Sequence, residues 1–126
     1  MDAKEIDFYN LGFAFIETNT MYVSDYKDGK WDDGKFVPFG PFEISPGACV
    51  LNYGQGIFEG MKAFKGKDGQ VRVFRWIENS KRLNRSARSI LMPEISEEIF
   101  KTALFRVIKL NERYIPPYES GASLYV

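Results

Sequence analysis

The sequence contains no histidine and only one cysteine, Cys49. Without histidine, the chain lacks the commonest general base and the usual Ser-His and Cys-His nucleophile pairs. One cysteine excludes a disulfide within the chain, and without histidine it leaves no zinc site of the usual Cys/His kind. We therefore expect no metal site and a small, buried Cys49. Any proton transfer would use lysine, tyrosine or a carboxylate, or a group outside this chain.

A net charge and long apolar segments are also missing. Seventeen Lys and Arg residues balance seventeen Asp and Glu residues, so no overall field attracts nucleic acid or an anionic membrane. No apolar run approaches the roughly 20 residues of a membrane span, and residues 1–5 have no signal-peptide character. The sequence therefore predicts a cytoplasmic protein with no nucleic-acid or membrane partner, in which any anion site is local.

The pattern of apolar residues and turns predicts an α+β fold, with a mostly antiparallel sheet and two main helices packed in two layers. The length of 126 residues fits one domain. Strands are expected over residues 22–26, 35–39, 57–65, 71–74 and from 123 onward. The strands over 57–65 and 71–74 should form a hairpin that turns at Asp68-Gly69.

The two helices are expected over residues 76–91 and from about 96 to about 113. Leu83, Ala87 and Ile90 recur on one face of the first, and Pro93 follows its end. Ser96 can cap the second helix. The second helix should bury a stripe of Ile99, Ala103, Val107 and Leu110, widened by Phe100, Leu104 and Ile108.

The segment YGQGIFEGMKAF, residues 53–64, contains three glycines and three aromatic residues. Its glycines are spaced G-x-G-x-x-x-G and precede a predicted strand, so they do not form a dinucleotide-binding loop, and no Walker lysine follows them. In a strand, Phe58, Gly60, Lys62 and Phe64 would share one face. That face could be a pocket wall that a planar ligand approaches, or an edge strand with a glycine bulge and a solvated lysine.

Arg82 and Ser86 lie four residues apart on the first predicted helix. At this spacing a guanidinium and a hydroxyl can converge on a phosphate, although such pairs are often only structural. The neighbouring cations Lys81, Arg85 and Arg88 should form a solvated face. A phosphate site would be refuted if Arg82 pointed away from the concave side of the predicted strand, or were locked into an ion pair that leaves no room for an anion.

Several motifs together resemble the small N-terminal domain of branched-chain amino acid aminotransferases, which are fold-type IV enzymes dependent on pyridoxal phosphate. These motifs are LNYGQGIFEGMKAF (51–64), VRVFRWIENSKRLNRSA (71–87), MP (92–93) and SGASLYV (120–126). The resemblance implies that Arg82 holds the cofactor phosphate. It also implies a substrate-pocket wall, whose residues would be Tyr53, Phe58, Gly60, Lys62 and Tyr125.

The resemblance further implies a reaction, a missing domain and partners. Family members transfer the amino group of leucine, isoleucine or valine to 2-oxoglutarate. Their Schiff-base lysine lies in a larger C-terminal domain that this sequence lacks, so no lysine here, including Lys62, is expected to be catalytic. We expect the 126-residue chain alone to be inactive and to bind cofactor weakly at best. It should pack on that C-terminal domain and form a homodimer or higher homo-oligomer, with Tyr53 acting across the interface.

Two alternatives remain open from the sequence. One is a related class-IV enzyme, either a D-amino acid aminotransferase or an aminodeoxychorismate lyase. The other is a non-catalytic interaction module. Lys62 and the SLYV motif favour the branched-chain group.

Overall fold

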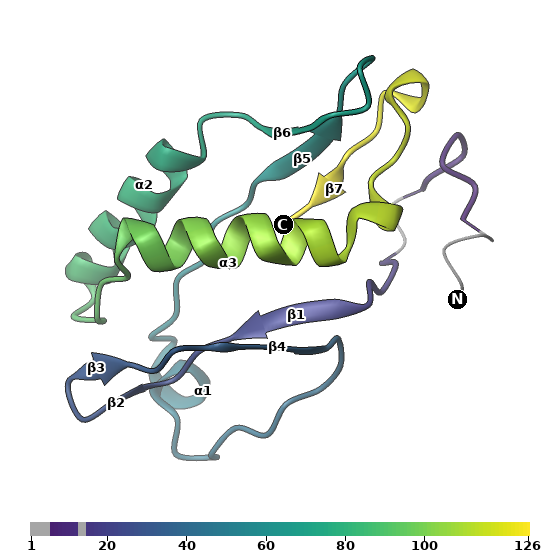
Figure 1. Ribbon diagram of the computed structural model, residues 1–126. Coiled ribbons are helices and arrows are strands. Elements are labelled where there is room, and N and C mark those ends of the chain that lie inside the picture. The colour runs from purple at the N-terminus through teal and green to yellow at the C-terminus, as the bar shows by residue number, and fades with distance from the viewer. Residues whose placement is uncertain (1–5, 13–14) are drawn as a thin grey trace.

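The computed structural model describes residues 6–12 and 15–126, and its strands form three small sheets (Figure 1). All strand pairs within the described residues are antiparallel. The sheets pair β1 (Thr20–Val23) with β4 (Lys35–Pro38), β2 (Tyr26–Lys27) with β3 (Lys30–Trp31), and β5 (Lys62–Lys65) with both β6 (Val71–Val73) and β7 (Leu124–Tyr125). The α+β prediction is confirmed, with the strands divided among three sheets.

Two helices supply the other layer. Helix α2 (Trp76–Ser89) is followed by α3 (Glu97–Leu110), which lies between β1 and the sheet of β5, β6 and β7 (Figure 1). Ser96 caps α3 as predicted, because its Oγ accepts the Ile99 amide at 3.2 Å. Short 3₁₀ turns, η2 (Glu112–Tyr114) and η3 (Tyr118–Ser120), lead from α3 to β7. None of the helices in the described ranges is long and apolar enough to cross a membrane.

The hydrophobic core forms where α3 packs on β5. Met61 and Ala63 alternate inward from the strand and meet Leu104 and Ile108 of the helix, all four buried. The predicted stripe of α3 is therefore centred on these two helix residues. Leu110, which we expected to be buried, is exposed, because it lies at the end of α3 beyond the face that packs on the sheet.

A buried amide attaches the first sheet to α3. Asn111, directly after the helix, accepts hydrogen bonds from the backbone amides of Asn19 and Thr20 at 3.0 Å each. Its Nδ2 donates to the carbonyls of Thr20 at 2.8 Å and Val107 at 2.9 Å. All four bonds are made by one side chain that is almost fully buried, so Asn111 fixes β1 against the end of α3.

Two features near the glycine-rich segment differ from expectation. A short helix, α1 (Cys49–Tyr53), was not predicted; it ends at Gly54, whose φ of 64° suits glycine. No residue of α1 is buried, so the prediction of a buried Cys49 was wrong. The strand expected from residue 57 begins at Lys62, because β7 pairs only with the chain from Met61 onward.

Candidate functional site

Arg82 forms a two-pronged ion pair with Glu59. Its Nε donates to Glu59 Oε1 at 2.6 Å, and its Nη2 donates to Oε2 at 2.7 Å. Arg82 projects from the middle of α2, whereas Glu59 lies in the irregular segment before β5. The pair therefore ties the helix to the approach of the strand, 23 residues away in sequence.

The two ions of this pair differ in their exposure. The Glu59 side chain is 7% exposed, whereas that of Arg82 is 57% exposed. Asn79, one turn before Arg82 on α2, donates from Nδ2 to Glu59 Oε2 at 2.8 Å and to the Gly60 carbonyl at 3.3 Å. The Arg82 guanidinium lowers the pKa of the Glu59 carboxyl against the burial that would raise it, and Asn79 lowers it further. Glu59 is therefore a buried, charged carboxylate, and both of its oxygens accept hydrogen bonds from α2.

The ion pair leaves part of Arg82 available to an anion. Glu59 occupies the Nε and Nη2 edge of the guanidinium, and Nη1 has no partner among residues 6–12 and 15–126. Ser86 lies one turn further along α2 and is half-buried. A guanidinium N–H and a hydroxyl one helical turn apart form a donor set that fits a phosphate. Arg82 thus keeps the capacity that the sequence interpretation requires.

A second group of predicted site residues shares one face of the sheet. Lys62 pairs directly with Tyr125 across β5 and β7, so their side chains lie on the same side. A Cβ added to Gly60 would lie 3.0 Å from ring atoms Cε2 and Cζ of Tyr125. The ring therefore covers the glycine, and the structure brings these three residues together. Asn79 links this cluster to the ion pair, because its Nδ2 donates to both the Gly60 carbonyl and Glu59 Oε2.

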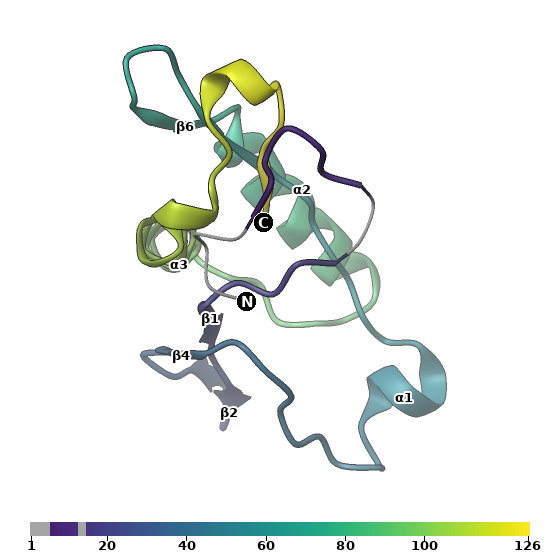
Figure 2. The ribbon, with the colours of Figure 1, turned by 90° about the vertical axis from the view of Figure 1, so that its right-hand side faces the viewer.

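Phe58 and Tyr53 are not part of this cluster. Both side chains are almost fully exposed, at 87% and 85% respectively. Tyr53 ends α1, which lies at the lower edge of the molecule, away from the C-terminus (Figure 2). Any role for Tyr53 near Tyr125 thus requires a surface from another subunit or domain.

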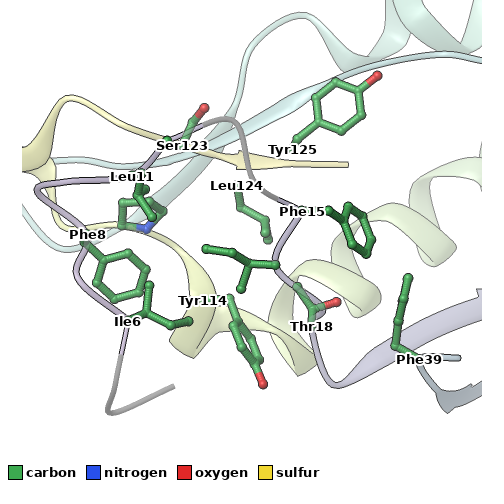
Figure 3. Close-up of a pocket in the computed structure, with 13 residues that line it drawn as sticks. Ile6, Phe8, Leu11, Phe15, Thr18, Phe39, Tyr114, Ser123, Leu124 and Tyr125 are labelled. Atoms are coloured by element: carbon green, nitrogen blue, oxygen red, sulfur yellow. The ribbon is translucent and has the colours of Figure 1, made fainter. Parts of the chain in front are cut away.

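A cavity beside β7 has Leu124 and Tyr125 of that strand among its lining residues. It has a volume of about 530 Å³, and the N-terminal segment forms one wall, with Phe8, Leu11 and Phe15 among its lining residues. In Figure 3, Leu124 points in among the other apolar side chains, whereas Tyr125 points away from them. Tyr125 therefore borders both this cavity and the face that it shares with Gly60 and Lys62.

The remaining cations of α2 are solvent-facing, as expected. Lys81 pairs with Glu78 at 3.2 Å and Arg88 pairs with Glu94 at 2.5 Å, and both pairs are exposed. Sequence interpretation missed Glu59 and Asn79. Asn79 and Arg82 are spaced i, i+3 on α2, which places them on one face, but no local pattern identifies their distant partner.

Comparison with known proteins identifies the kind of protein to which this chain is similar. No family model matches the chain. The chain is 44% identical over 123 residues to a protein of Helicobacter pylori, covering 98% of this chain and 36% of that protein. It is 42% identical to a protein of Haemophilus influenzae, covering 98% and 36%, and 40% identical to one of Bacillus subtilis, covering 93% and 33%.

All three of these relatives are aminotransferases by name. More particularly, they are named branched-chain-amino-acid aminotransferases or, for the Bacillus protein, branched-chain-amino-acid transaminase 1. The resemblance identified from the motifs is therefore confirmed. The chain spans about a third of the length of the curated relatives it matches.

Proposed function

We propose that this chain is the N-terminal small domain of a pyridoxal-phosphate-dependent branched-chain-amino-acid aminotransferase. The enzyme would transfer the amino group of leucine, isoleucine or valine to 2-oxoglutarate, in the cytoplasm. The identity of 40–44% over 93–98% of the chain to three proteins of that name carries the proposal. No observation favours a D-amino acid aminotransferase, an aminodeoxychorismate lyase or a non-catalytic module.

Arg82 and Ser86 are the residues that would hold the cofactor phosphate. This role is supported by Nη1 of Arg82, which has no partner within residues 6–12 and 15–126, and by the Ser86 hydroxyl one helical turn away. When bound, pyridoxal phosphate supplies a conjugated ring that accepts the electron pair released from the substrate. The Schiff-base lysine would come from the larger C-terminal domain, so the contribution of this chain is to bind and orient.

The substrate would lie against the wall of Tyr53, Phe58, Gly60, Lys62 and Tyr125. An aromatic wall suits a branched aliphatic side chain, whose burial is worth about 1.5 to 3 kcal/mol. Lys62 stands directly across from Tyr125, and its positive charge can orient the substrate carboxylate.

The exposed aromatic residues support the proposed partners of this domain. Tyr53 and Phe58 are large apolar side chains left uncovered by the described residues, and such surfaces favour protein contacts. We propose that the C-terminal domain and a second subunit cover them. The enzyme would then be a homodimer or a higher homo-oligomer.

Two assays test the proposed function. The full-length protein is assayed with leucine, D-alanine and aminodeoxychorismate, and the expected result is transamination of leucine with 2-oxoglutarate. The 126-residue chain is titrated with pyridoxal phosphate and is expected to show no turnover. A full-length protein that processes D-alanine or aminodeoxychorismate but not leucine would refute the assignment.

A further inference from the structure

The Glu59–Arg82 pair differs from an ordinary surface ion pair. An exposed pair gains little, because water screens both charges and two flexible side chains must be ordered. Here the carboxylate is 7% exposed and accepts from Arg82 Nε, Arg82 Nη2 and Asn79 Nδ2. The burial and the three donors fix the acceptor, so its arginine partner is also held in one orientation.

Asn79 extends this arrangement to the backbone. Its Nδ2 group contacts both the Glu59 carboxylate and the Gly60 carbonyl. Asn79 and Arg82 stand three residues apart on α2, so one helix face supplies all the side-chain donors that Glu59 has among the described residues. The guanidinium is therefore held relative to both the helix and the segment that leads into β5.

A two-pronged pair also sets where the remaining donors of Arg82 point. Parallel hydrogen bonds through Nε and Nη2 place the guanidinium and the carboxylate near one plane. Nη1 and the second N–H of Nη2 then point away from Glu59. An unrestrained arginine loses rotamer entropy when it is immobilised, and a preoriented one loses less when it binds an anion.

We propose that Glu59, held by Asn79, is the positioning residue that orients Arg82 to receive the cofactor phosphate. This inference rests on the proposed function and gives a role to two residues outside the expected phosphate site and substrate wall. The Glu59 carboxylate also has an unfavourable electrostatic effect, because a negative charge beside Arg82 opposes the approach of an anion. Orientation of Arg82 by Glu59 would strengthen cofactor binding, whereas repulsion by its carboxylate would weaken it. Removing the Glu59 charge should therefore lower the affinity if orientation dominates and raise it if repulsion dominates.

The test measures pyridoxal phosphate affinity of the full-length apoenzyme by absorbance and fluorescence titration. Glu59→Gln keeps the shape but loses the two-pronged acceptor, and its dissociation constant should rise about tenfold, as when supporting groups behind other binding residues are lost. Asn79→Ala should raise the dissociation constant too, but by less.

Asp68→Asn is the matched control, because Asp68 also receives two bonds from one arginine, Arg72, at 2.9 and 2.6 Å. The affinity of Asp68→Asn for pyridoxal phosphate should equal that of the wild-type protein.

A double-mutant cycle with Arg82 separates the positioning of Arg82 by Glu59 from a general effect of the substitution on folding. In an Arg82→Met background, Glu59→Gln should cause no further loss of cofactor affinity. An equal loss in both backgrounds, or an unchanged or tighter affinity in Glu59→Gln alone, would overturn the inference while leaving the proposed function intact. If circular dichroism shows that Glu59→Gln does not fold, Asn79→Ala is used in its place in both backgrounds, and the same criteria apply. A wild-type enzyme that binds no pyridoxal phosphate would overturn both.

Discussion

The ring of Tyr125 covers Gly60 so closely that no side chain fits between them. A Cβ at Gly60 would lie 3.0 Å from Cε2 and Cζ of the ring and would overlap the hydroxyl oxygen. Gly60 is not among the residues with positive φ, so the ring and not the backbone conformation requires glycine. Gly60 and Tyr125 are 65 residues apart in sequence. Their close packing thus depends on the absence of a side chain at position 60.

Gly60→Ala should therefore affect the position of Tyr125 more than stability. Because Tyr125 is 66% exposed, its ring can swing outward, and the free energy of unfolding should change by no more than about 0.5 kcal/mol. The displaced ring should raise the KM of the full-length enzyme for leucine on the order of tenfold, comparable to one methyl group too many in a pocket.

Steady-state kinetics and chemical denaturation check this prediction. Gly47→Ala is the control, since a Cβ there meets only Ser45 Oγ at an ordinary 3.6 Å. Unchanged KM in Gly60→Ala would mean that the Tyr125 face does not contact substrate.

Asn111→Ala should be strongly destabilising. The substitution leaves the amides of Asn19 and Thr20 and the carbonyl of Thr20 without their buried partner, whereas the Val107 carbonyl keeps the Asn111 backbone amide at 3.1 Å. The expected loss in the free energy of unfolding is about 2 to 4 kcal/mol, since each unsatisfied buried group costs on the order of 1 to 3 kcal/mol. Urea denaturation followed by circular dichroism measures it.

Asn10→Ala is the control for the loss of an asparagine side chain. The Asn10 amide group reaches only Asp7, at 2.7 Å on the surface. Its effect should stay within about 0.5 kcal/mol. Equal effects of the two substitutions would show that the Asn111 bonds do not hold β1 on α3.

Local patterns were enough to predict the two main helices and the hairpin of β5 and β6. Helix α2 begins at Trp76 as expected, and Ser96 caps α3. The Asp68-Gly69 turn joins β5 to β6, with Gly69 at a φ of 75°. These features depend on residues a few positions apart, whose periodicity and turn chemistry are visible in the sequence.

Features that depend on distant contacts were not predicted. Glu59 meets Arg82 across 23 residues, and no spacing rule connects a strand approach with the middle of a helix. Helix α1 has five residues and no buried face, so it lacks an apolar period. Only Gly54, at its C-terminal end, could have indicated it. The cluster of Gly60, Lys62 and Tyr125 was anticipated from alternation for the first two, and from family resemblance for the third.

Acidification should remove the stabilising contribution of Glu59. Its pKa in the folded chain lies below the ordinary 4.5, chiefly because of Arg82. A lowered folded-state pKa gives stability that is present above the unfolded-state value and is lost as pH falls through the folded-state value. The difference in unfolding free energy between wild type and Glu59→Gln should therefore be largest above pH 4.5 and shrink below it.

Urea denaturation at a series of pH values measures this difference. The pKa values of Asp7, Asp32, Asp68 and Glu112 are also lowered by their hydrogen-bond partners. These groups are common to both proteins, so their contributions cancel in the difference. A difference that is independent of pH would show that Glu59 carries no charge-dependent bond.

The exposed position of Tyr53 leads to a complementation test in the full-length enzyme. If Tyr53 completes the pocket of a neighbouring subunit, Tyr53→Ala should lower activity without destabilising its own subunit, because the side chain is 85% exposed. Arg82→Ala should be inactive through loss of the cofactor phosphate contact. In a hybrid dimer, one pocket would carry both changes and the other neither. Unfolding and refolding an equal mixture should then restore about a quarter of wild-type activity by random pairing in a closed dimer. A mixture no more active than the average of the two separate variants would mean that Tyr53 and Arg82 serve the same subunit's pocket.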